Sequence, residues 1–246
     1  MTVSDGIAEI RLNRPERLNA INPDLLSGFA AALEKAEKDP GVEVILICGE
    51  GRAFCAGDDL KEFHQQSSGK AETRRFIEDI QRITELIVNG EKIVVGAIHG
   101  WAVGGGFEWV LNCDLAIMAE GCRCFLPEIN LGLFVTGGIS ALLPNAVGLQ
   151  KAKAMILFGE QITAKEALDM GLVYRVAPDD RVYEEAVATA ARIAGLPKLA
   201  RRNVKKVLNR SFQLSLADAM KLETDATVDC FLDPETAVRI GNTEIS

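Results

Sequence analysis

Histidine and positive charge are scarce in this 246-residue chain. Only His64 and His99 occur, and both are remote in sequence from the closest cysteine pair, Cys122 and Cys124, so no zinc-ligand spacing is present and we expect no metal. Lys and Arg number 27 against 35 Asp and Glu, which gives a formal net charge of −8. Non-specific binding to nucleic acid needs a basic surface, so this balance argues against a nucleic-acid partner.

A long uninterrupted apolar run is also missing. The most apolar stretch, residues 93–119, is broken by five glycines, by His99 and by polar or acidic residues, which is not the pattern of a membrane span. The first residues carry no positive segment followed by an apolar run, so we expect no signal peptide and a cytoplasmic protein. The six cysteines are scattered, and we expect them to be reduced and buried.

The chain does contain an ordinary share of apolar and charged residues. Hydrophobic residues make up 48% and charged residues 25%, which argues against a disordered chain. The length allows one large domain, or one domain and a small appendage.

Strand and helix patterns alternate along the first part of the chain. Apolar runs predict strands at 7–12, 42–48, 93–98 and 115–119, and the 3.6-residue period predicts helices at 23–38 and 71–88. Asn22 and Pro23 form a helix start, and the glycine run 104–106 opens another helix that ends near Cys113. This alternation predicts an α/β fold with largely parallel strands.

After about residue 145 the pattern becomes mainly helical. Helices are predicted at 150–157, 163–170, 180–194, 197–208 and 216–231, with one short strand near 172–176. Thr163 and Glu166 match a capping box. The predicted organisation is an α/β core over residues 1–190 and a C-terminal helical region over 191–246.

Three segments are unusual for a plain globular domain. Residues 52–60 follow a buried strand and contain Gly57, whose freedom lets the backbone turn and its N–H groups point outward. Residues 97–108 join a strand, a glycine run and a helix start, where free N–H groups stabilise negative charge. Residues 125–133 place an acid in an apolar loop.

Each of these segments also has a structural interpretation. The glycine run could serve tight packing, and Glu108 and Glu128 could each complement the dipole of a first helical turn. Both acids, however, lie among apolar neighbours, where an unpaired carboxylate is costly. Two carboxylates near a preorganised anion site are a known arrangement for acid–base catalysis.

Taken together, the motifs resemble the enoyl-CoA hydratase/isomerase family, the crotonase superfamily. The similarity covers the chain to about residue 180, in family order, at residues 13–21, 54–60, 100–108, 113–114, 125–132 and 162–173. It implies a spiral of repeated ββα units with a C-terminal all-α trimerisation region, assembled as a homotrimer or a dimer of trimers.

The resemblance also implies an acyl-CoA thioester whose carbonyl oxygen lies in an oxyanion hole made by the backbone N–H groups of Asp58 and Gly105. Asp58 stands where the family commonly has alanine, so we expect its carboxylate to turn away from the developing enolate. Glu108 and Glu128 match the two acids of family hydratases, which add water across the C2=C3 bond of a 2-enoyl-CoA. Coenzyme A is part of that substrate, and no further cofactor is implied.

Other activities remain open at this stage. An enoyl-CoA isomerase or an acyl-CoA hydrolase of the same superfamily would need Glu128 alone. A non-catalytic acyl-CoA-binding subunit would need neither acid. The glycine run does not match Gly-x-Gly-x-x-Gly, so an NAD site is disfavoured.

For coenzyme A, the resemblance points to Arg17 as a phosphate contact, although Arg17 could equally be a solvated turn residue. It assigns the adenine to backbone groups of Ala20, in the turn 17–20, and of Ala56, which begins a second binding stretch that ends at Leu60. Val135 and Thr136 stand where the family often has Pro-Gly in the wall of the acyl pocket, and the bulkier Phe134 and Val135 are expected to reshape that pocket.

Six basic residues crowd the segment 198–210. They are Lys198, Arg201, Arg202, Lys205, Lys206 and Arg210. They could border the coenzyme A phosphates or a subunit contact, but a solvated helix face is the favoured interpretation.

Overall fold

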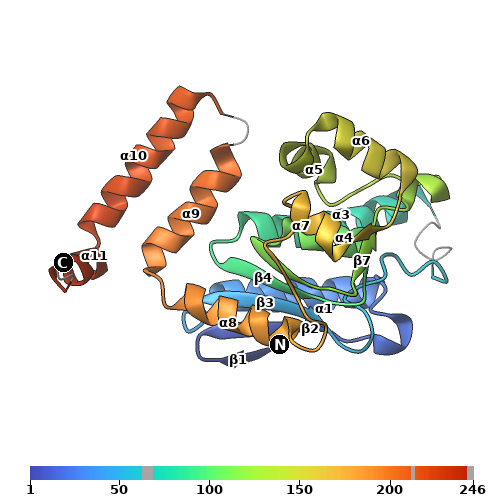
Figure 1. Ribbon diagram of the computed structural model, residues 1–246, viewed down its shortest axis with the longest axis horizontal. Coiled ribbons are helices and arrows are strands. Elements are labelled where there is room, and N and C mark those ends of the chain that lie inside the picture. The colour runs from blue at the N-terminus through green and yellow to red at the C-terminus, as the bar shows by residue number, and fades with distance from the viewer. Residues whose placement is uncertain (63–68, 212–213, 243–246) are drawn as a thin grey trace.

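The computed structural model describes residues 1–62, 69–211 and 214–242 and is built around a sheet of six strands (Figure 1). Its order is β1-β2-β3-β4-β6-β9, with β1 antiparallel to β2 and all later neighbours parallel. The central strands β3 and β4 are buried at every position, as expected for strands covered on both faces. The strand bounds are β1 Thr2–Ser4, β2 Ile7–Leu12, β3 Val44–Gly49, β4 Ile93–Ile98, β6 Leu115–Ala119 and β9 Arg175–Ala177.

A second, smaller sheet has the order β5-β7-β8, formed by Trp101–Val103, Arg123–Phe125 and Ile162–Thr163. Each of its first two strands follows a strand of the large sheet and precedes a helical turn. The chain thus runs from β4 through β5 into α4 (Gly105–Asn112), and from β6 through β7 into the 3₁₀ turn η2 (Glu128–Leu131). The predicted crotonase-like α/β fold of repeated ββα units is confirmed.

The longer helices of the core begin and end close to the predicted residues. Asn22 caps α1 (Pro23–Lys38) by accepting the N–H of Leu25 at 3.0 Å, and α3 (Lys70–Asn89) packs against α1 and α4. The capping box of Thr163 and Glu166 starts α7 (Ala164–Asp169) as predicted. Helix α8 (Val182–Ala194) packs along β3, β4 and β6.

Several elements differ from the sequence prediction. Strands β5, β7 and β8 have at most three residues, too few for an alternating pattern to show. Helix α5 (Ile139–Val147) was missed because Pro144 lies inside it, and it leads directly into α6 (Leu149–Phe158). Strand β9 begins later than predicted, because Gly171 at a φ of +72° continues the turn after α7.

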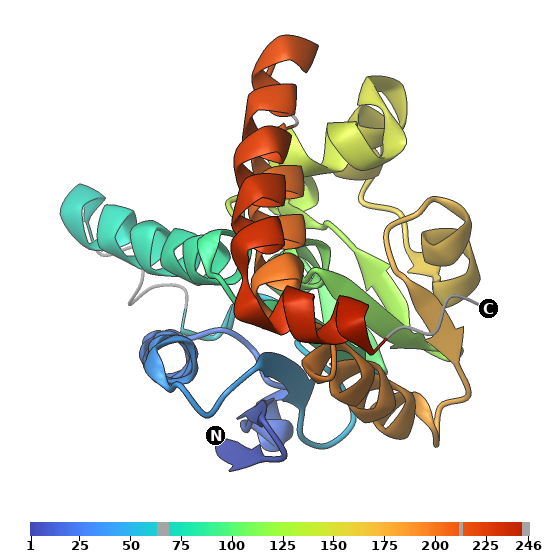
Figure 2. The same cartoon turned by 90° about the vertical axis from the view of Figure 1, so that its left-hand side faces the viewer.

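The C-terminal helices α9 (Lys198–Ser211), α10 (Leu216–Leu232) and α11 (Pro234–Gly241) stand at one side of the core (Figures 1 and 2). Helix α11 was not predicted. Helix α10 packs on α9 and α11 and has no buried residue. The boundary at residue 190 and the trimerisation role of this region stay predictions.

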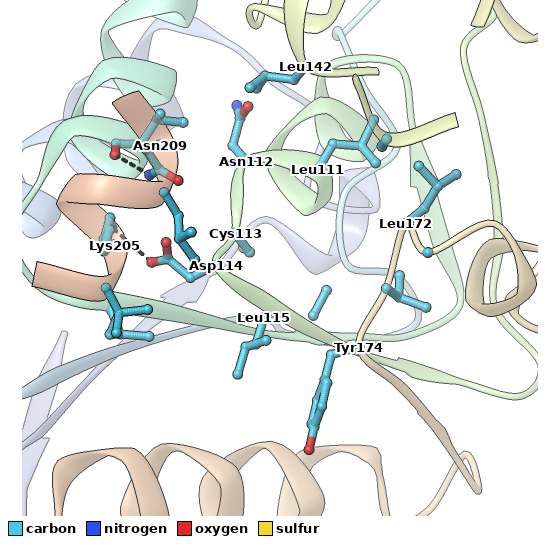
Figure 3. Close-up of a pocket in the computed structure, with 18 of the residues that line it drawn as sticks. Leu111, Asn112, Cys113, Asp114, Leu115, Leu142, Leu172, Tyr174, Lys205 and Asn209 are labelled. Carbon is cyan, nitrogen blue, oxygen red and sulfur yellow. Dashed lines mark hydrogen bonds and ion pairs between the residues drawn. The ribbon is translucent and has the colours of Figure 1, made fainter. Parts of the chain in front are cut away.

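The basic segment of α9 is not the solvated face that the sequence favoured. The Lys205 ammonium is buried, donates to the carbonyls of Ile87 and Lys92 at 2.6 and 2.7 Å, and pairs with Asp114 at 2.8 Å (Figure 3). Arg201 is also buried and pairs with Glu43. Complementary acids of the core, which only the fold brings near, therefore anchor this helix.

Beside this anchor, α9 and the core enclose a cavity of about 630 Å³ (Figure 3). Leu111, Leu142, Leu172 and Tyr174 are among the residues that line it, and none of the predicted site residues does. Its lining includes Val204 and Leu208, two large apolar side chains that α9 leaves more than half exposed.

Candidate active site

Two glycine-containing loops lie against each other at the ends of β3 and β4. Cys55 pairs with the second sheet, where its N–H donates to the Trp101 carbonyl at 3.1 Å and its carbonyl accepts the N–H of Val103 at 3.0 Å. A Cβ on Gly57 would lie 2.7 Å from the Val103 carbonyl oxygen, and the φ of Gly57 is +79°. Only glycine permits this approach, which brings Asp58 beside Gly105.

The N–H groups of Asp58 and Gly105 are both free within the described ranges. The neighbours of Asp58 are engaged, since Ile21 donates to the Gly57 carbonyl and accepts from Asp59, but the Asp58 N–H makes no hydrogen bond. Gly105 is the first residue of α4, so its N–H has no intrahelical partner. Two free donors at a helix N-terminus form a site that favours negative charge.

Glu108 lies one turn further along α4 and is only 1% exposed. Its Oε1 accepts the Thr136 N–H at 2.9 Å, and its Oε2 accepts the Gly137 N–H at 2.8 Å and the Thr136 hydroxyl at 3.1 Å. Burial raises the pKa of Glu108, and these hydrogen bonds act against the rise by favouring the carboxylate.

Thr136 is a contact of the site that the sequence analysis did not assign. Its departure from the family pattern was visible in the sequence and was attributed to the acyl pocket along with that of Val135. The structure instead places its hydroxyl and its N–H on the carboxylate of Glu108.

Glu128 begins η2 and faces the glycine run. Its Oε1 lies 2.6 Å from the position that a Cβ of Gly104 would take, and the φ of Gly104 is +52°. Its Oε2 is buried and has no hydrogen-bond partner in the described part of the chain. Burial raises the pKa of Glu128 to about 7, and the negative charges of Glu108 and Asp58 add to the rise.

The carboxyl group of Asp58 does not turn away from the site, so that expectation is wrong. Its Oδ1 lies 3.8 Å from the position of a Cβ on Gly105. Whereas Asp59 pairs with Arg14 and Arg17, the acids Glu108 and Glu128 interact electrostatically with Asp58. Burial raises its pKa to about 6, and Glu108 contributes to the rise.

The predicted coenzyme A residues form a network beside these loops. The Arg17 guanidinium donates two hydrogen bonds to the Asp59 carboxylate, at 2.5 and 3.2 Å, and Arg14 pairs with the same carboxylate at 3.2 Å. Ala20 donates its N–H to the Arg17 carbonyl at 3.0 Å, and the Ala20 carbonyl accepts from Arg14 at 2.6 Å. Arg17 is therefore held in a fixed position rather than being a solvated turn residue.

The same network joins the turn to the loop after β3. Ala56 donates its N–H to the Leu18 carbonyl at 3.0 Å. The turn passes through Leu18 and Asn19 in the left-handed region, and the Asn19 amide donates to the carbonyls of Glu50 and Ala53. Asn19 was not assigned a role from the sequence alone, although it stands within the family motif.

The remaining predicted contacts differ in exposure. Leu60 is 55% exposed and Phe134 65% exposed, whereas Val135 is 7% exposed and belongs to the core cluster. The structure thus places Phe134 at the surface of the loop that carries Thr136, and Val135 beneath it. Their effect on the acyl group stays a prediction.

The described ranges contain neither a cluster of metal ligands nor a helix that could span a membrane. No group of three or more His, Cys, Asp or Glu among the described residues could hold a metal ion, and His64 lies outside those residues. Within the described chain no helix combines the length and apolarity that crossing a bilayer requires. The cytoplasmic location stays a prediction.

Comparisons with known proteins agree with the motifs and the fold. The family model for enoyl-CoA hydratase/isomerase matches residues 2–237. A crotonyl-CoA hydratase of Syntrophomonas wolfei is 34% identical over 92% of this chain and 87% of its own, and the mitochondrial enoyl-CoA hydratase of Pongo abelii is 34% identical over 89% and 74%. The crystal structure of an enoyl-CoA hydratase from Polaromonas sp. JS666 superposes with a TM-score of 0.93, at 27% identity, over 98% of this chain and 94% of that one. This chain belongs to the enoyl-CoA hydratase/isomerase family.

Proposed function

We propose that this protein is an enoyl-CoA hydratase that adds water across the C2=C3 bond of a 2-enoyl-CoA. The observation that carries the proposal is the placement of two acids with opposite hydrogen-bonding environments, Glu108 and Glu128, beside two free backbone N–H groups. A hydration needs both a group that accepts a proton from water and a group that donates one to carbon.

The N–H groups of Asp58 and Gly105 would hold the thioester oxygen. Negative charge develops on that oxygen when water attacks C3, and fixed donors stabilise it without reorganisation. The start of α4 adds the positive end of its dipole in the same place.

The different hydrogen bonding of the two acids gives them different roles in proton transfer. Glu108 receives three hydrogen bonds that favour its ionised form, so it accepts a proton from the attacking water as the C3–O bond forms. Glu128 has a pKa of about 7 and a buried oxygen without a partner, so it holds a proton and delivers it to C2. A proton returning from Glu108 to Glu128 restores both groups.

Arg17, held by Asp59, would meet a phosphate of coenzyme A. Backbone groups of Ala20 and Ala56 would meet the adenine, and the stretch that starts at Ala56 would end its contacts at Leu60. Phe134 and Val135 would shape the acyl side. No cofactor besides the substrate's own coenzyme A enters these steps.

We also propose assembly as a homotrimer or a dimer of trimers through the C-terminal helices. Helix α10 exposes large apolar side chains, with Leu216, Phe231 and Leu232 each more than three-quarters exposed. Light scattering after size exclusion tests the assembly, and a monomer at micromolar concentration would contradict it.

A spectrophotometric assay with 2-enoyl-CoA esters of varied chain length tests the activity. We expect turnover of at least one ester and its loss in Glu108→Gln. Isomerisation or thioester hydrolysis without hydration, insensitive to Glu108→Gln, would instead favour an isomerase or an acyl-CoA hydrolase. Binding of the esters without any reaction would favour an acyl-CoA-binding subunit.

A further inference from the structure

Asp58 contributes a third carboxyl group that the hydration steps do not use. Its backbone N–H is one proposed oxyanion donor, and its Oδ1 lies beside the residue that supplies the other, 3.8 Å from the position of a Cβ on Gly105. Its side chain makes no hydrogen bond or ion pair to any residue of the described ranges. A negative charge here would lie next to the oxygen that becomes negative during the reaction.

The groups around Asp58 are acidic or apolar. Glu108 approaches from α4, Glu128 from η2 and the Cys55 thiol from its own loop, while Ile21 covers it from the segment before α1. The arginines of the preceding turn, Arg14 and Arg17, are bound to Asp59. No cation among the described residues acts on the Asp58 carboxyl group.

We propose, on the basis of the hydratase function above, that Asp58 acts in its neutral form, and that its ionisation prevents the enolate from forming beside it. Two carboxyl groups, Asp58 and Glu128, must then carry protons in the active enzyme, while Glu108 must not. With an alanine at position 58, only Glu128 would have to be protonated.

The direction of the pH effect follows from the cluster. Burial and the charge of Glu108 raise the pKa of Asp58 to about 6, so a substantial neutral fraction exists in weak acid and declines as the pH rises. The alkaline limb of the kcat/KM profile should therefore report the loss of two protons, from Asp58 and from Glu128.

The test measures the pH profile of kcat/KM for wild type, Asp58→Asn and Asp58→Ala. Both substitutions remove the charge and keep the backbone N–H. On the alkaline limb we expect kcat/KM to fall by about 100-fold per pH unit in wild type. In both variants it should fall by about 10-fold per pH unit, because they lack one of the two titrating groups. Glu50→Gln is the matched control, since it removes a carboxylate from the same loop that does not act on the cluster.

A second readout is independent of turnover. A 3-oxoacyl-CoA ionises to an enolate, and its bound enolate is followed by ultraviolet absorbance. We expect its affinity to fall with pH about tenfold more per unit in wild type than in Asp58→Asn. Equal slopes in wild type and variants, or loss of hydration at every pH in both variants, would overturn the proposal.

The two proposals fail in different ways. If no enoyl-CoA is hydrated but enolate affinity still depends on Asp58, the hydratase function is wrong and the neutral role of Asp58 stands. If the enzyme hydrates enoyl-CoA and the alkaline limb of kcat/KM has the same slope in wild type and both Asp58 variants, only the role of Asp58 is wrong.

Discussion

Two groups of buried or partly buried carboxylates in this protein differ in what surrounds them. Asp114, the residue before β6, accepts the Val94 N–H at 2.7 Å and pairs with Lys205 of α9 at 2.8 Å. The cluster of Asp58, Glu108 and Glu128 contains three acids, and no cation of the described residues contacts their carboxyl groups. Burial raises the pKa of Asp114 as well, but there the Lys205 ammonium lowers it in part.

The difference separates a structural carboxylate from reactive ones. A buried charge with a close partner is a fixed link, here between the core and the C-terminal helices. Buried acids without a cation keep pKa values near those needed for proton transfer, at a cost in stability that the large apolar core offsets. The absence of a cationic partner among the described residues is thus the property that distinguishes the site.

The strongest test of this comparison is Glu128→Gln. The variant keeps the shape of the side chain but has no acidic proton to deliver to C2, so we expect kcat to fall by about 10²–10⁴-fold. The kcat of Glu108→Gln should fall by a similar factor because that variant lacks the base. Circular dichroism and urea unfolding provide the folding control. A fully active Glu128→Gln would remove Glu128 from the mechanism.

At the paired site, Lys205→Met should act on stability instead. It leaves Asp114 buried without its cation, and we expect the free energy of unfolding to fall by about 3–5 kcal/mol. Adding Asp114→Asn should recover part of the loss. Lys206→Met, next to it on the exposed side of α9, is the control and should change stability by less than about 0.5 kcal/mol. Equal stability of the two single variants would mean that the ion pair does not hold the helix.

Thr136→Val sharpens the contrast within the acid cluster. It removes one of the three hydrogen bonds on Glu108 while keeping the shape of the side chain, so the ionised base is less favoured and its pKa rises. We expect kcat near neutral pH to fall about tenfold and the acid limb of kcat/KM to move to higher pH. Thr136→Ser, which retains a hydroxyl, should stay near wild type. An unmoved acid limb would show that the hydroxyl does not influence Glu108.

The smallest effect is the pH dependence of stability. Burial raises the pKa of Glu128 from 4.5 to about 7, so folding favours its neutral form. This contribution is present below pH 4.5 and is lost as the pH rises through about 7. Between pH 5 and pH 8, the free energy of unfolding of Glu128→Gln should therefore rise relative to that of wild type by on the order of 1 kcal/mol, after allowance for solvent screening. Urea midpoints at both pH values measure it, and a relative loss would have the wrong sign.

Much of the core fold was predictable because its signals are local. The strands over 7–12 and 93–98 and the helix over 23–38 have the predicted bounds, since their apolar periodicity and the Asn22 cap act within a few residues. The short strands of the second sheet were not predictable. Their pairing joins residues such as Trp101 and Arg123, which are distant in sequence, and three residues carry no period.

The candidate site also has residues that the sequence predicts and contacts that it does not. Glu108, Glu128 and the glycine run were identifiable from acids and glycines in apolar surroundings, together with the family motifs. The side-chain direction of Asp58 and the Thr136 contact were not, because each depends on a neighbour from another segment. For Asp58 that neighbour is Ile21, and for Thr136 it is Glu108.

The sequence by itself determined the family, the strand and helix pattern of the core and the two candidate acids, because periodicity, capping and motif spacing are properties of neighbouring residues. Only the tertiary structure decided which buried charges have partners. It placed Lys205 on Asp114, and within the described ranges it brought no cation to Asp58 or Glu128. The physical reason is that the ionisation of a buried acid depends on every charge and dipole within a few ångströms, and folding brings those from distant parts of the chain.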